Sequence, residues 1–137
     1  MREVKLITIT PVLMLVLFSL SLINASGQDV YIPDANFKAA LVGNASINTN
    51  SDSEIQCTEA AAFTGTINVS SLSISDLTGI EAFTALTDLY CNINQLTSLD
   101  VKNGNNINIT GFYDENNPNL TCIQVDDVSY SNYYWSS

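Results

Sequence analysis

The chain has 137 residues, with 14 acidic and 4 basic side chains, three cysteines and no histidine. A surface this acidic repels phosphate backbones and anionic lipid, so we expect no nucleic-acid partner, whereas divalent cations are attracted. The missing histidine removes the usual general base, the serine triads and most zinc sites. Because three is an odd number, the cysteines cannot all pair within one chain.

Residues 1–27 have the pattern of a secretory signal peptide. Arg2 and Lys5 give a basic start, residues 6–23 are almost wholly apolar, and small residues lead up to Gly27. We expect cleavage after Gly27, which makes the protein secreted or extracellular and leaves attachment to the cell surface open. Retention of the apolar run as a membrane anchor is the alternative. After cleavage we expect no membrane partner.

Residues 28–66 are expected to form a helical N-terminal cap. Asp34 has the character of an N-cap residue, Phe37 and Leu41 follow at helical spacing, and Gly43 is a suitable stop. A second short helix is expected over residues 58–63.

The twelve residues between these helices resemble the calcium-binding loop of an EF-hand. Such a loop uses side-chain oxygens at positions one, three and five, a backbone carbonyl at seven, a water at nine and a bidentate Glu at twelve. The corresponding residues are Asn48, Asn50, Asp52, Glu54, Gln56 and Glu59. Asn replaces the usual first Asp and Ser53 replaces the usual Gly, so the pattern predicts a weak Ca²⁺ site, with a Kd of roughly 10⁻⁴ to 10⁻³ M. The alternative is an asparagine-rich connector whose side chains cap their own backbone.

Residues 67–125 contain a degenerate repeat. The tetrad Leu-Thr-Gly-Ile at 77–80 returns as Leu-Thr-Ser-Leu at 96–99 and as Leu-Thr-Cys-Ile at 120–123. The offsets of 19 and 24 residues lie in or near the range of leucine-rich repeats. The preceding stretches 72–76, 89–94 and 112–117 are the expected strands. The predicted fold class is α/β, a short leucine-rich-repeat solenoid of about three irregular turns with a helical N-terminal cap.

The middle copy has the alternation of a strand. Leu89 and Cys91 should be buried, whereas Tyr90 and Asn92 should be exposed. Asn94 ends this strand, and its amide is expected to bond buried backbone groups of the turn. In the third copy Asp114 aligns with the buried Cys91. We therefore expect an irregular last turn with Asp114 tilted to the rim, because burying an unpaired carboxylate is costly.

These motifs together resemble the secreted leucine-rich repeat proteins of Bacteroidetes. The resemblance rests on the runs IPDANFKAALVG, INTNSDSEIQCTEA, ISDLTGIEAFTALTDLYC, NQLTSLDV and NNPNLTCIQVDD, which cover nearly the whole chain after residue 27. It implies a helical cap followed by stacked repeats, with this chain a short member carrying an EF-hand-like cap. Many family members continue to a further cysteine and a sorting domain for type IX secretion. This sequence departs from that pattern, since it has few repeats and ends at Ser137.

The tail, residues 126–137, carries four aromatic side chains at positions 130, 133, 134 and 135. They are expected either to cap the open end of the last turn or to form a stacking platform for sugar rings. No paired acids of the glycosidase type are expected, because the acids at 114–115 and 126–127 are adjacent and neighbours in a strand point to opposite sides.

The sequence predicts a non-enzymatic protein. We expect a secreted leucine-rich-repeat interaction module, stabilised by Ca²⁺, that binds protein or glycan at the cell surface. Its binding patch on the concave face would consist of Asp88, Tyr90, Asn92 and Tyr113. The alternatives are a structural component of the surface or matrix, and a truncated family remnant without a specific ligand.

Overall fold

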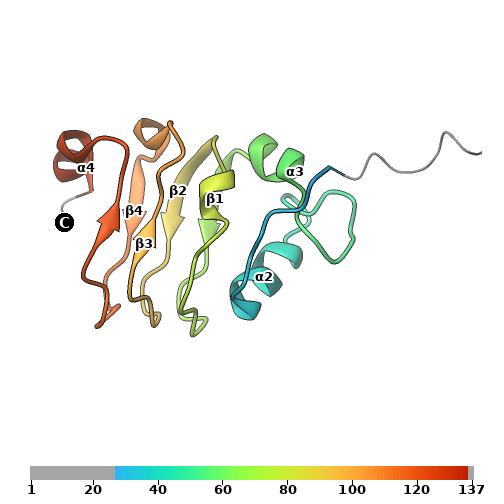
Figure 1. Ribbon diagram of the computed structural model, residues 1–137, viewed down its shortest axis with the longest axis horizontal. Coiled ribbons are helices and arrows are strands. Elements are labelled where there is room, and N and C mark those ends of the chain that lie inside the picture. Colours follow the sequence, from blue (N-terminus) through green and yellow to red (C-terminus); the bar gives the residue numbers. More distant parts are fainter. Residues whose placement is uncertain (1–26, 136–137) are drawn as a thin grey trace, which may run out of the picture.

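The computed structural model describes residues 27–135, which form an elongated body (Figure 1). Helices α2 (Ala35–Val42) and α3 (Cys57–Ala62) lie at one end, and α4 (Val128–Tyr134) lies at the other. The predicted signal peptide, residues 1–27, lies outside this range except for Gly27. Between residues 27 and 135, no helix has the length and apolar character needed to cross a membrane.

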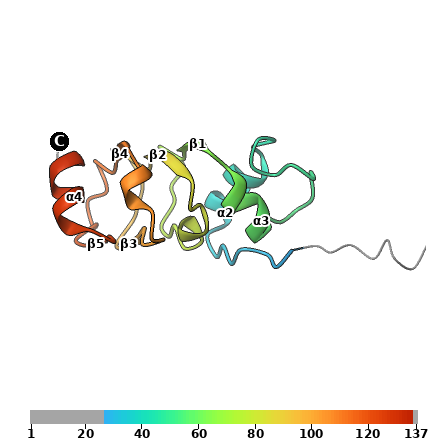
Figure 2. The same cartoon turned by 90° about the horizontal axis from the view of Figure 1, so that it is seen from above.

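The strands between the helices form two separate parallel sheets. The larger sheet has the order β1-β2-β4, and the smaller one pairs β3 with β5. The two sheets lie along opposite long sides of the body, as the view from above shows (Figure 2). The strands are β1 (Gly65–Asn68), β2 (Leu86–Tyr90), β3 (Leu99–Asp100), β4 (Gly111–Tyr113) and β5 (Ile123–Gln124), and the 3₁₀ turns are η2 (Ile80–Ala82) and η3 (Asn106–Asn108).

The helices at the N-terminal end begin at or within one residue of the predicted positions. Asp34 caps α2, since its carboxylate accepts hydrogen bonds from the backbone N–H groups of Asn36 and Phe37. In α3, Gln56 and Glu59 form a reciprocal capping box, which satisfies two of the free N–H groups of the first turn. The predicted N-cap of the first helix is therefore confirmed, and the second helix begins one residue earlier than predicted.

The core fills the space between the two sheets and extends under α2 and α3. Leu89 and Cys91 are fully buried, which confirms the inward positions predicted for them. The other large buried side chains of this core are spread along the described part of the chain and include Phe37, Leu41, Ile67, Phe83, Leu96, Leu99 and Ile109. Burial of apolar surface at this scale is the main source of stability of such a domain.

Asn94 lies buried in the turn after β2 and bonds the backbone of its own and the preceding segment. Its Nδ2 donates to the carbonyl of Val69 at 2.8 Å and to that of Cys91 at 3.0 Å. Its Oδ1 accepts from the N–H of Ile74 at 3.0 Å and from that of Leu72 at 3.2 Å. The role predicted for Asn94 is therefore confirmed.

The expected leucine-rich-repeat solenoid of about three turns is wrong. In a solenoid, each copy of the repeat would form a strand at the equivalent position. Residues 72–76, where the first of these strands was expected, form no strand. Ser71 and Ser73 have positive φ angles of 61° and 56°, and this left-handed backbone cannot continue a strand. The described part of the chain instead has one three-stranded and one two-stranded parallel sheet, with helices at both ends.

The strand register also differs from the one that the first two tetrads predict. Ile67 in β1 lies opposite Leu89 in β2, an offset of 22 residues rather than 19. The register that the second and third tetrads predict is confirmed, because Leu99 lies opposite Ile123 at the predicted offset of 24.

Candidate functional site

The structure brings the four predicted binding residues together on one side of the larger sheet. Asp88 and Tyr90 alternate with the buried Leu89 in β2, and Tyr113 lies opposite Tyr90 in β4. Asn92 follows two residues after Tyr90. We call this surface the outer face and define it by Thr66, Asn68, Asp88, Tyr90, Asn92 and Tyr113. In Figure 2 the helices α2, α3 and α4 lie at the ends of the body, so none of these three covers the outer face.

Two tyrosine rings form the apolar part of the outer face. The rings of Tyr90 and Tyr113 meet edge to face, with centroids 4.6 Å apart and planes at 86°. Tyr113 is 46% exposed, whereas Tyr90 is half-buried. The pair therefore offers a ligand both an aromatic surface and two phenolic hydroxyl groups.

Asp88 supplies the charge of the outer face and is held by its neighbours. Its Oδ2 accepts from the hydroxyl of Thr87 at 2.7 Å and from that of Thr66 at 3.3 Å. The carboxylate lies over Gly111 of β4, where any side chain would overlap it. Glycine at this position therefore leaves room for Asp88 to cross to the neighbouring strand.

The sequence analysis missed Thr66 and Asn68, which extend the outer face onto β1. They lie opposite Asp88 and Tyr90 in the register of the sheet. They were missed because the first strand was expected at residues 72–76. The alternation in Thr66-Ile67-Asn68-Val69, with Ile67 and Val69 buried, was the signal that could have found them.

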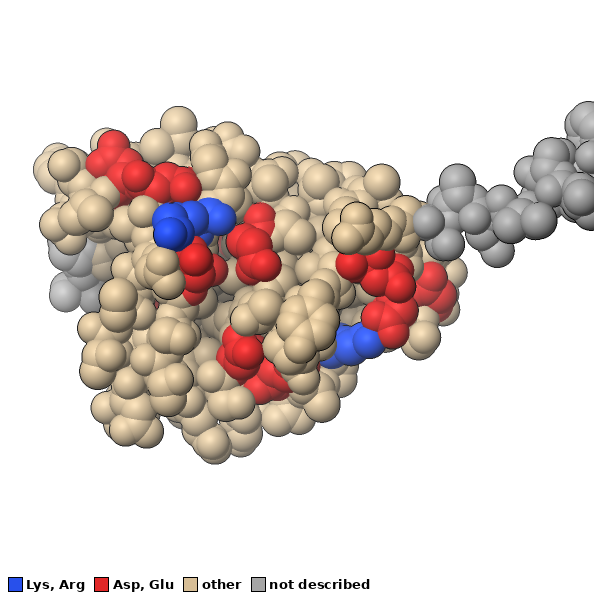
Figure 3. Space-filling view, in the orientation of Figure 1, with Lys and Arg blue, Asp and Glu red and all other residues tan. Residues whose placement is uncertain are grey.

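The charge of the described surface is mainly negative. Figure 3 shows acidic groups spread over the side that carries β3, with only small basic areas among them. Lys38 and Lys102 are the two basic residues between positions 27 and 135. Lys38 pairs with Glu54 at 2.6 Å, and Lys102 lies 3.8 Å from Asp100. This surface suits neutral polar ligands and cations better than anions.

Five of the six predicted calcium ligands lie between α2 and α3, and the sixth, Glu59, lies in the first turn of α3. The side chains of Asn50, Asp52 and Gln56 contact one another, and Glu59 reaches back to the start of the loop. Glu54 turns its carboxylate away to Lys38, as suits a residue expected to use only its carbonyl. No group of three or more His, Cys, Asp or Glu residues gathers as a metal site within residues 27–135.

Hydrogen bonds set the charge state of the two carboxylates in this loop. The N–H of Glu54 and the amides of Asn50 and Gln56 lower the pKa of Asp52. Burial alone would raise the pKa of Glu59, but the N–H groups of Gln56, Thr49 and Asn50 outweigh it and lower that pKa. Both groups are therefore held as carboxylates, the form that binds cations.

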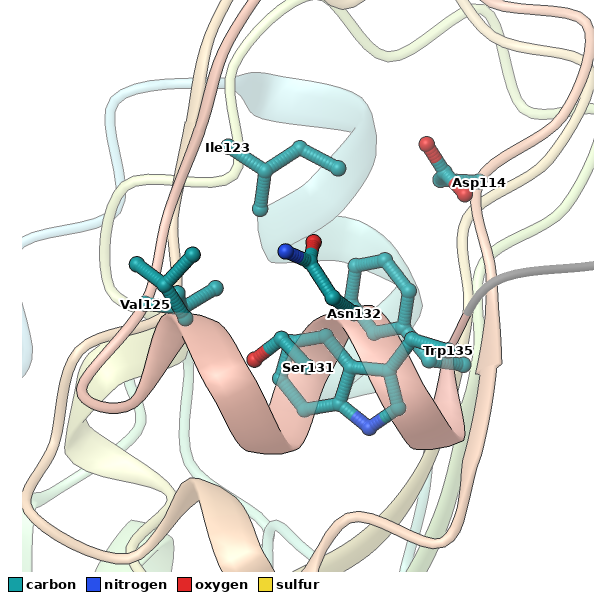
Figure 4. A pocket seen from close by; sticks show the side chains of 8 residues that line it. Asp114, Ile123, Val125, Ser131, Asn132 and Trp135 are labelled. Atoms are coloured by element: carbon teal, nitrogen blue, oxygen red, sulfur yellow. The ribbon is translucent and has the colours of Figure 1, made fainter.

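A hollow that we call the C-terminal pocket lies between β4, β5 and α4 and has a volume of about 280 Å³. Its walls are mostly apolar, and Figure 4 shows Asn132 pointing into it from α4 with Asp114 on the far side. Asp114 is half-buried. Burial, with a smaller contribution from the charge of Glu115, raises its pKa. Asp114, expected at the rim of the last turn, thus lies on the wall of this pocket and is not fully buried as Cys91 is.

The aromatic tail covers the end of the body next to this pocket. Trp135 stacks on Phe112 with centroids 4.5 Å apart, and its Nε1 donates to the carbonyl of Ile109 at 2.9 Å. The hydroxyl of Tyr130 donates to the carbonyl of Ile107. These contacts match the capping alternative, although Tyr133 and Tyr134 remain exposed.

All three cysteines are free thiols. Cys57 and Cys122 are exposed, whereas Cys91 is buried. Burial, together with the charges of Asp114 and Glu115, raises the pKa of the Cys91 thiol to about 12. Cys91 is thus an unreactive apolar side chain of the core.

No protein-family model and no curated protein matches the chain. Among solved structures, it is similar to part of ZmpB of Clostridium perfringens, in a structure of the CBM51-2 and INT domains and in another that includes CBM51-2 in complex with GlcNAc. In both cases the identity is 21%, the TM-score is 0.43, and the match covers 56% of this chain and 15% of that chain. The bound GlcNAc belongs to that protein. A likeness this distant leaves the function of this chain to the geometry of its own surfaces.

Proposed function

We propose that this protein is an extracellular, non-catalytic binding module that holds a glycan on the outer face. Its place outside the cell rests on the signal-peptide pattern of residues 1–27. The observation that carries the proposal is the side-by-side arrangement of Tyr90 and Tyr113 with Asp88 and Asn92 on an uncovered sheet.

This combination of groups suits a sugar. The C–H groups of a pyranose pack against an aromatic face, while its hydroxyl groups need acceptors and donors close by. Tyr113 supplies the exposed ring. Asp88 and Asn92, two residues before and two residues after Tyr90, supply oxygens on either side of it. Lys and Arg are missing from the outer face, which disfavours anionic ligands.

The size of the outer face favours a glycan over a folded protein. β2, its longest strand, has five residues, and β4 has three. A stable protein complex usually buries about 800 Å² on each partner, which is more than such a patch supplies. A short oligosaccharide needs far less area.

Of the two adjacent acidic pairs, one stabilises the fold and the other is divided between a pocket and the solvent, which supports binding without catalysis. Asp126 accepts from the N–H groups of Asn103 and Asn106, and Asp127 accepts from those of Ser129 and Tyr130 at the start of α4. Asp114 lies in the C-terminal pocket, and its neighbour Glu115 is exposed.

The test is a screen of the purified protein against immobilised extracellular oligosaccharides, followed by titration of any hit. We expect Tyr113→Ala and Asp88→Ala each to weaken the binding at least about tenfold, equivalent to 1.4 kcal/mol. Tyr133→Ala, which removes an exposed ring of α4 away from the outer face, should bind like the unmodified chain. Failure to bind any glycan, or equal affinity of the Tyr113 and Tyr133 variants, would overturn the proposal. Saturable binding of a protein that Tyr113→Ala abolishes would replace the glycan by a protein ligand.

A further inference from the structure

The polar side chains of the loop 48–59 point inward and contact one another. Asn50 Nδ2 lies 2.8 Å from Asp52 Oδ2 and 2.7 Å from Gln56 Oε1. Gln56 Nε2 lies 3.0 Å from the same Asp52 oxygen. The side chains at the third, fifth and ninth positions of the loop thus converge on one small volume.

Glu59, at the twelfth position, is held over the beginning of the same loop. Its Oε1 accepts from the N–H of Thr49 at 2.8 Å and from that of Asn50 at 3.2 Å. Its Oε2 accepts from the N–H of Gln56 at 3.1 Å. The helix α3 therefore fixes a carboxylate near the cluster, with both oxygens turned toward the loop.

An independent observation concerns Asn48, at the first position. Its side chain lies between the end of α2 and the loop, because Nδ2 donates to the carbonyl of Val42 at 3.1 Å and to that of Asp52 at 2.8 Å. The residue is only 4% exposed, and its Oδ1 accepts no hydrogen bond from any residue that the structure describes. A buried carbonyl oxygen without a partner is unfavourable, and a cation or a water molecule would satisfy it.

The hydrogen-bond donors around the Asp52 carboxylate mark a position that a cation could take. Two amide NH₂ groups, from Asn50 and Gln56, point at one carboxylate oxygen, where their partial positive charge substitutes for a cation. Each amide exchanges its nitrogen for its oxygen by half a turn about its last side-chain bond. The loop can therefore offer oxygens to a cation without unfolding.

We propose that the loop from Asn48 to Glu59 binds one Ca²⁺ ion, and that the ion stabilises the N-terminal end of the protein. The side-chain oxygens come from Asn48, Asn50, Asp52 and Glu59, with the carbonyl of Glu54 and a water held by Gln56. This set consists of oxygens alone, which Ca²⁺ prefers, and its length and flexibility suit six to eight ligands better than the strict octahedron of Mg²⁺. The proposal does not depend on glycan binding at the outer face.

The small number of charged ligands limits the expected affinity for Ca²⁺. Only Asp52 and Glu59 bring charge, so the Kd should lie at roughly 10⁻⁴ to 10⁻³ M, as in extracellular modules. An EF-hand makes its sharp turn at a glycine in the sixth position, which is Ser53 here, whereas the positive φ angle of this loop, 60°, is at Ser51. The turn of this loop therefore falls two residues earlier than in an EF-hand.

The test is calorimetric titration of the purified protein with CaCl₂, together with thermal unfolding in 10 mM Ca²⁺ against a chelator. At ~10 mM, well above the expected Kd, the melting temperature should rise by roughly 5–15 °C, and Mg²⁺ should give a smaller rise. Glu59→Gln and Asp52→Asn should both abolish the Ca²⁺-dependent rise. Glu54→Gln is the matched control, because it removes one charge from the same loop but keeps the carbonyl, and it should retain the rise.

Glu59 also caps α3, so its variant is judged by the difference between Ca²⁺ and chelator, not by its absolute melting temperature. The absence of heat and of any shift in the unmodified chain would overturn the proposal and leave a self-capped connector. A rise of equal size in Glu59→Gln and in the unmodified chain would overturn it as well, because the ion would then bind elsewhere.

Discussion

The side-chain amides of Asn94 and Asn117 donate to one and the same acceptor, the backbone carbonyl of Cys91, each at 3.0 Å. Asn94 approaches from the turn after β2, and Asn117 from the turn after β4. The Oδ1 of Asn117 in turn accepts from the N–H of Leu96 at 3.1 Å. The two amides thus tie successive turns of the chain together inside the core.

Removing these amides should destabilise the protein. We expect Asn94→Ala to lower the free energy of unfolding by about 2–3 kcal/mol, because it leaves buried backbone groups without partners. Asn117→Ala should cost less, since its side chain makes fewer bonds. Urea unfolding measures both, with Asn105→Ala at an exposed position as the control. Because the two side chains share one acceptor, the double variant should deviate from additivity. Strict additivity would argue against the shared bond.

A charge at position 89 should unfold the protein. Leu89 is fully buried between the sheets, so Leu89→Asp places a carboxylate in the core without a partner. We expect the cooperative thermal transition to disappear, as seen by circular dichroism. Thr97→Asp adds the same charge at an exposed position and should melt like the unmodified chain. An unchanged melting temperature of the Leu89 variant would contradict the inward assignment.

A methyl group at position 111 should displace Asp88. The Cβ of Gly111→Ala would overlap the Asp88 carboxylate, which ends a flexible side chain and can turn away, so we expect a loss of about 1 kcal/mol in the free energy of unfolding, the low end for overpacking. The double variant with Asp88→Ala removes the overlapping atoms and should recover most of this loss. If the second substitution recovers nothing, the cost of the first lies elsewhere in the strand.

The three thiols should differ in reactivity. Cys57 and Cys122 are exposed and should react with iodoacetamide at pH 8 in the folded state. Cys91 should react only after unfolding, because it is buried and its pKa is raised to about 12. Mass spectrometry of the labelled, reduced protein counts the modified residues. In denatured monomer without reductant, at least one free thiol is expected. Labelling of Cys91 at the rate of the other two would refute its burial.

Asp114 should make stability depend on pH. Its folded-state pKa is raised, so folding favours the protonated form. The stabilising contribution is fully present below the unfolded value of 3.8 and is lost as the pH rises through the folded value. We therefore expect Asp114→Asn to be more stable than the unmodified chain at pH 7, by about 0.5 kcal/mol. The gain should shrink on acidification toward pH 3.8, whereas the exposed Asp100→Asn should show no such gain. A gain that grows on acidification would mean that folding lowers the pKa of Asp114 and does not raise it.

The parts of the fold that depend on local chemistry could be predicted from the sequence. The cap at Asp34 follows from a side chain bonding N–H groups two and three residues on, and the inward positions of Leu89 and Cys91 follow from the period of a strand. For the same reason the outer-face residues of β2 were identified correctly. Asn94 was identified because a polar residue ending a buried strand must satisfy backbone groups.

The parts that depend on pairing between distant segments could not be predicted as well. The first strand was expected at residues 72–76, just before the first Leu-Thr tetrad. A repeated sequence does not by itself set the register of a sheet, whereas the burial of Ile67 opposite Leu89 does. The left-handed backbone at Ser71 and Ser73 gave no signal, because serine carries no preference for it as glycine does. Thr66 and Asn68 were therefore missing from the candidate site. The unpartnered oxygen of Asn48 is likewise visible only once the loop is folded.

Within residues 27–135, each of the three strand pairings joins segments separated by almost the same length of chain. The partners Ile67 and Leu89 are 22 residues apart, Leu89 and Phe112 are 23 apart, and Leu99 and Ile123 are 24 apart. Because the entropy of loop closure depends only on the logarithm of the length, these three closures differ by roughly 0.1 kcal/mol. Chain connectivity therefore gives no pairing an advantage in the search for the native state. The order of folding is set by how much each pairing buries, so we expect nucleation at β1 and β2, whose contact is the longest, with the two-residue pairing of β3 and β5 forming last.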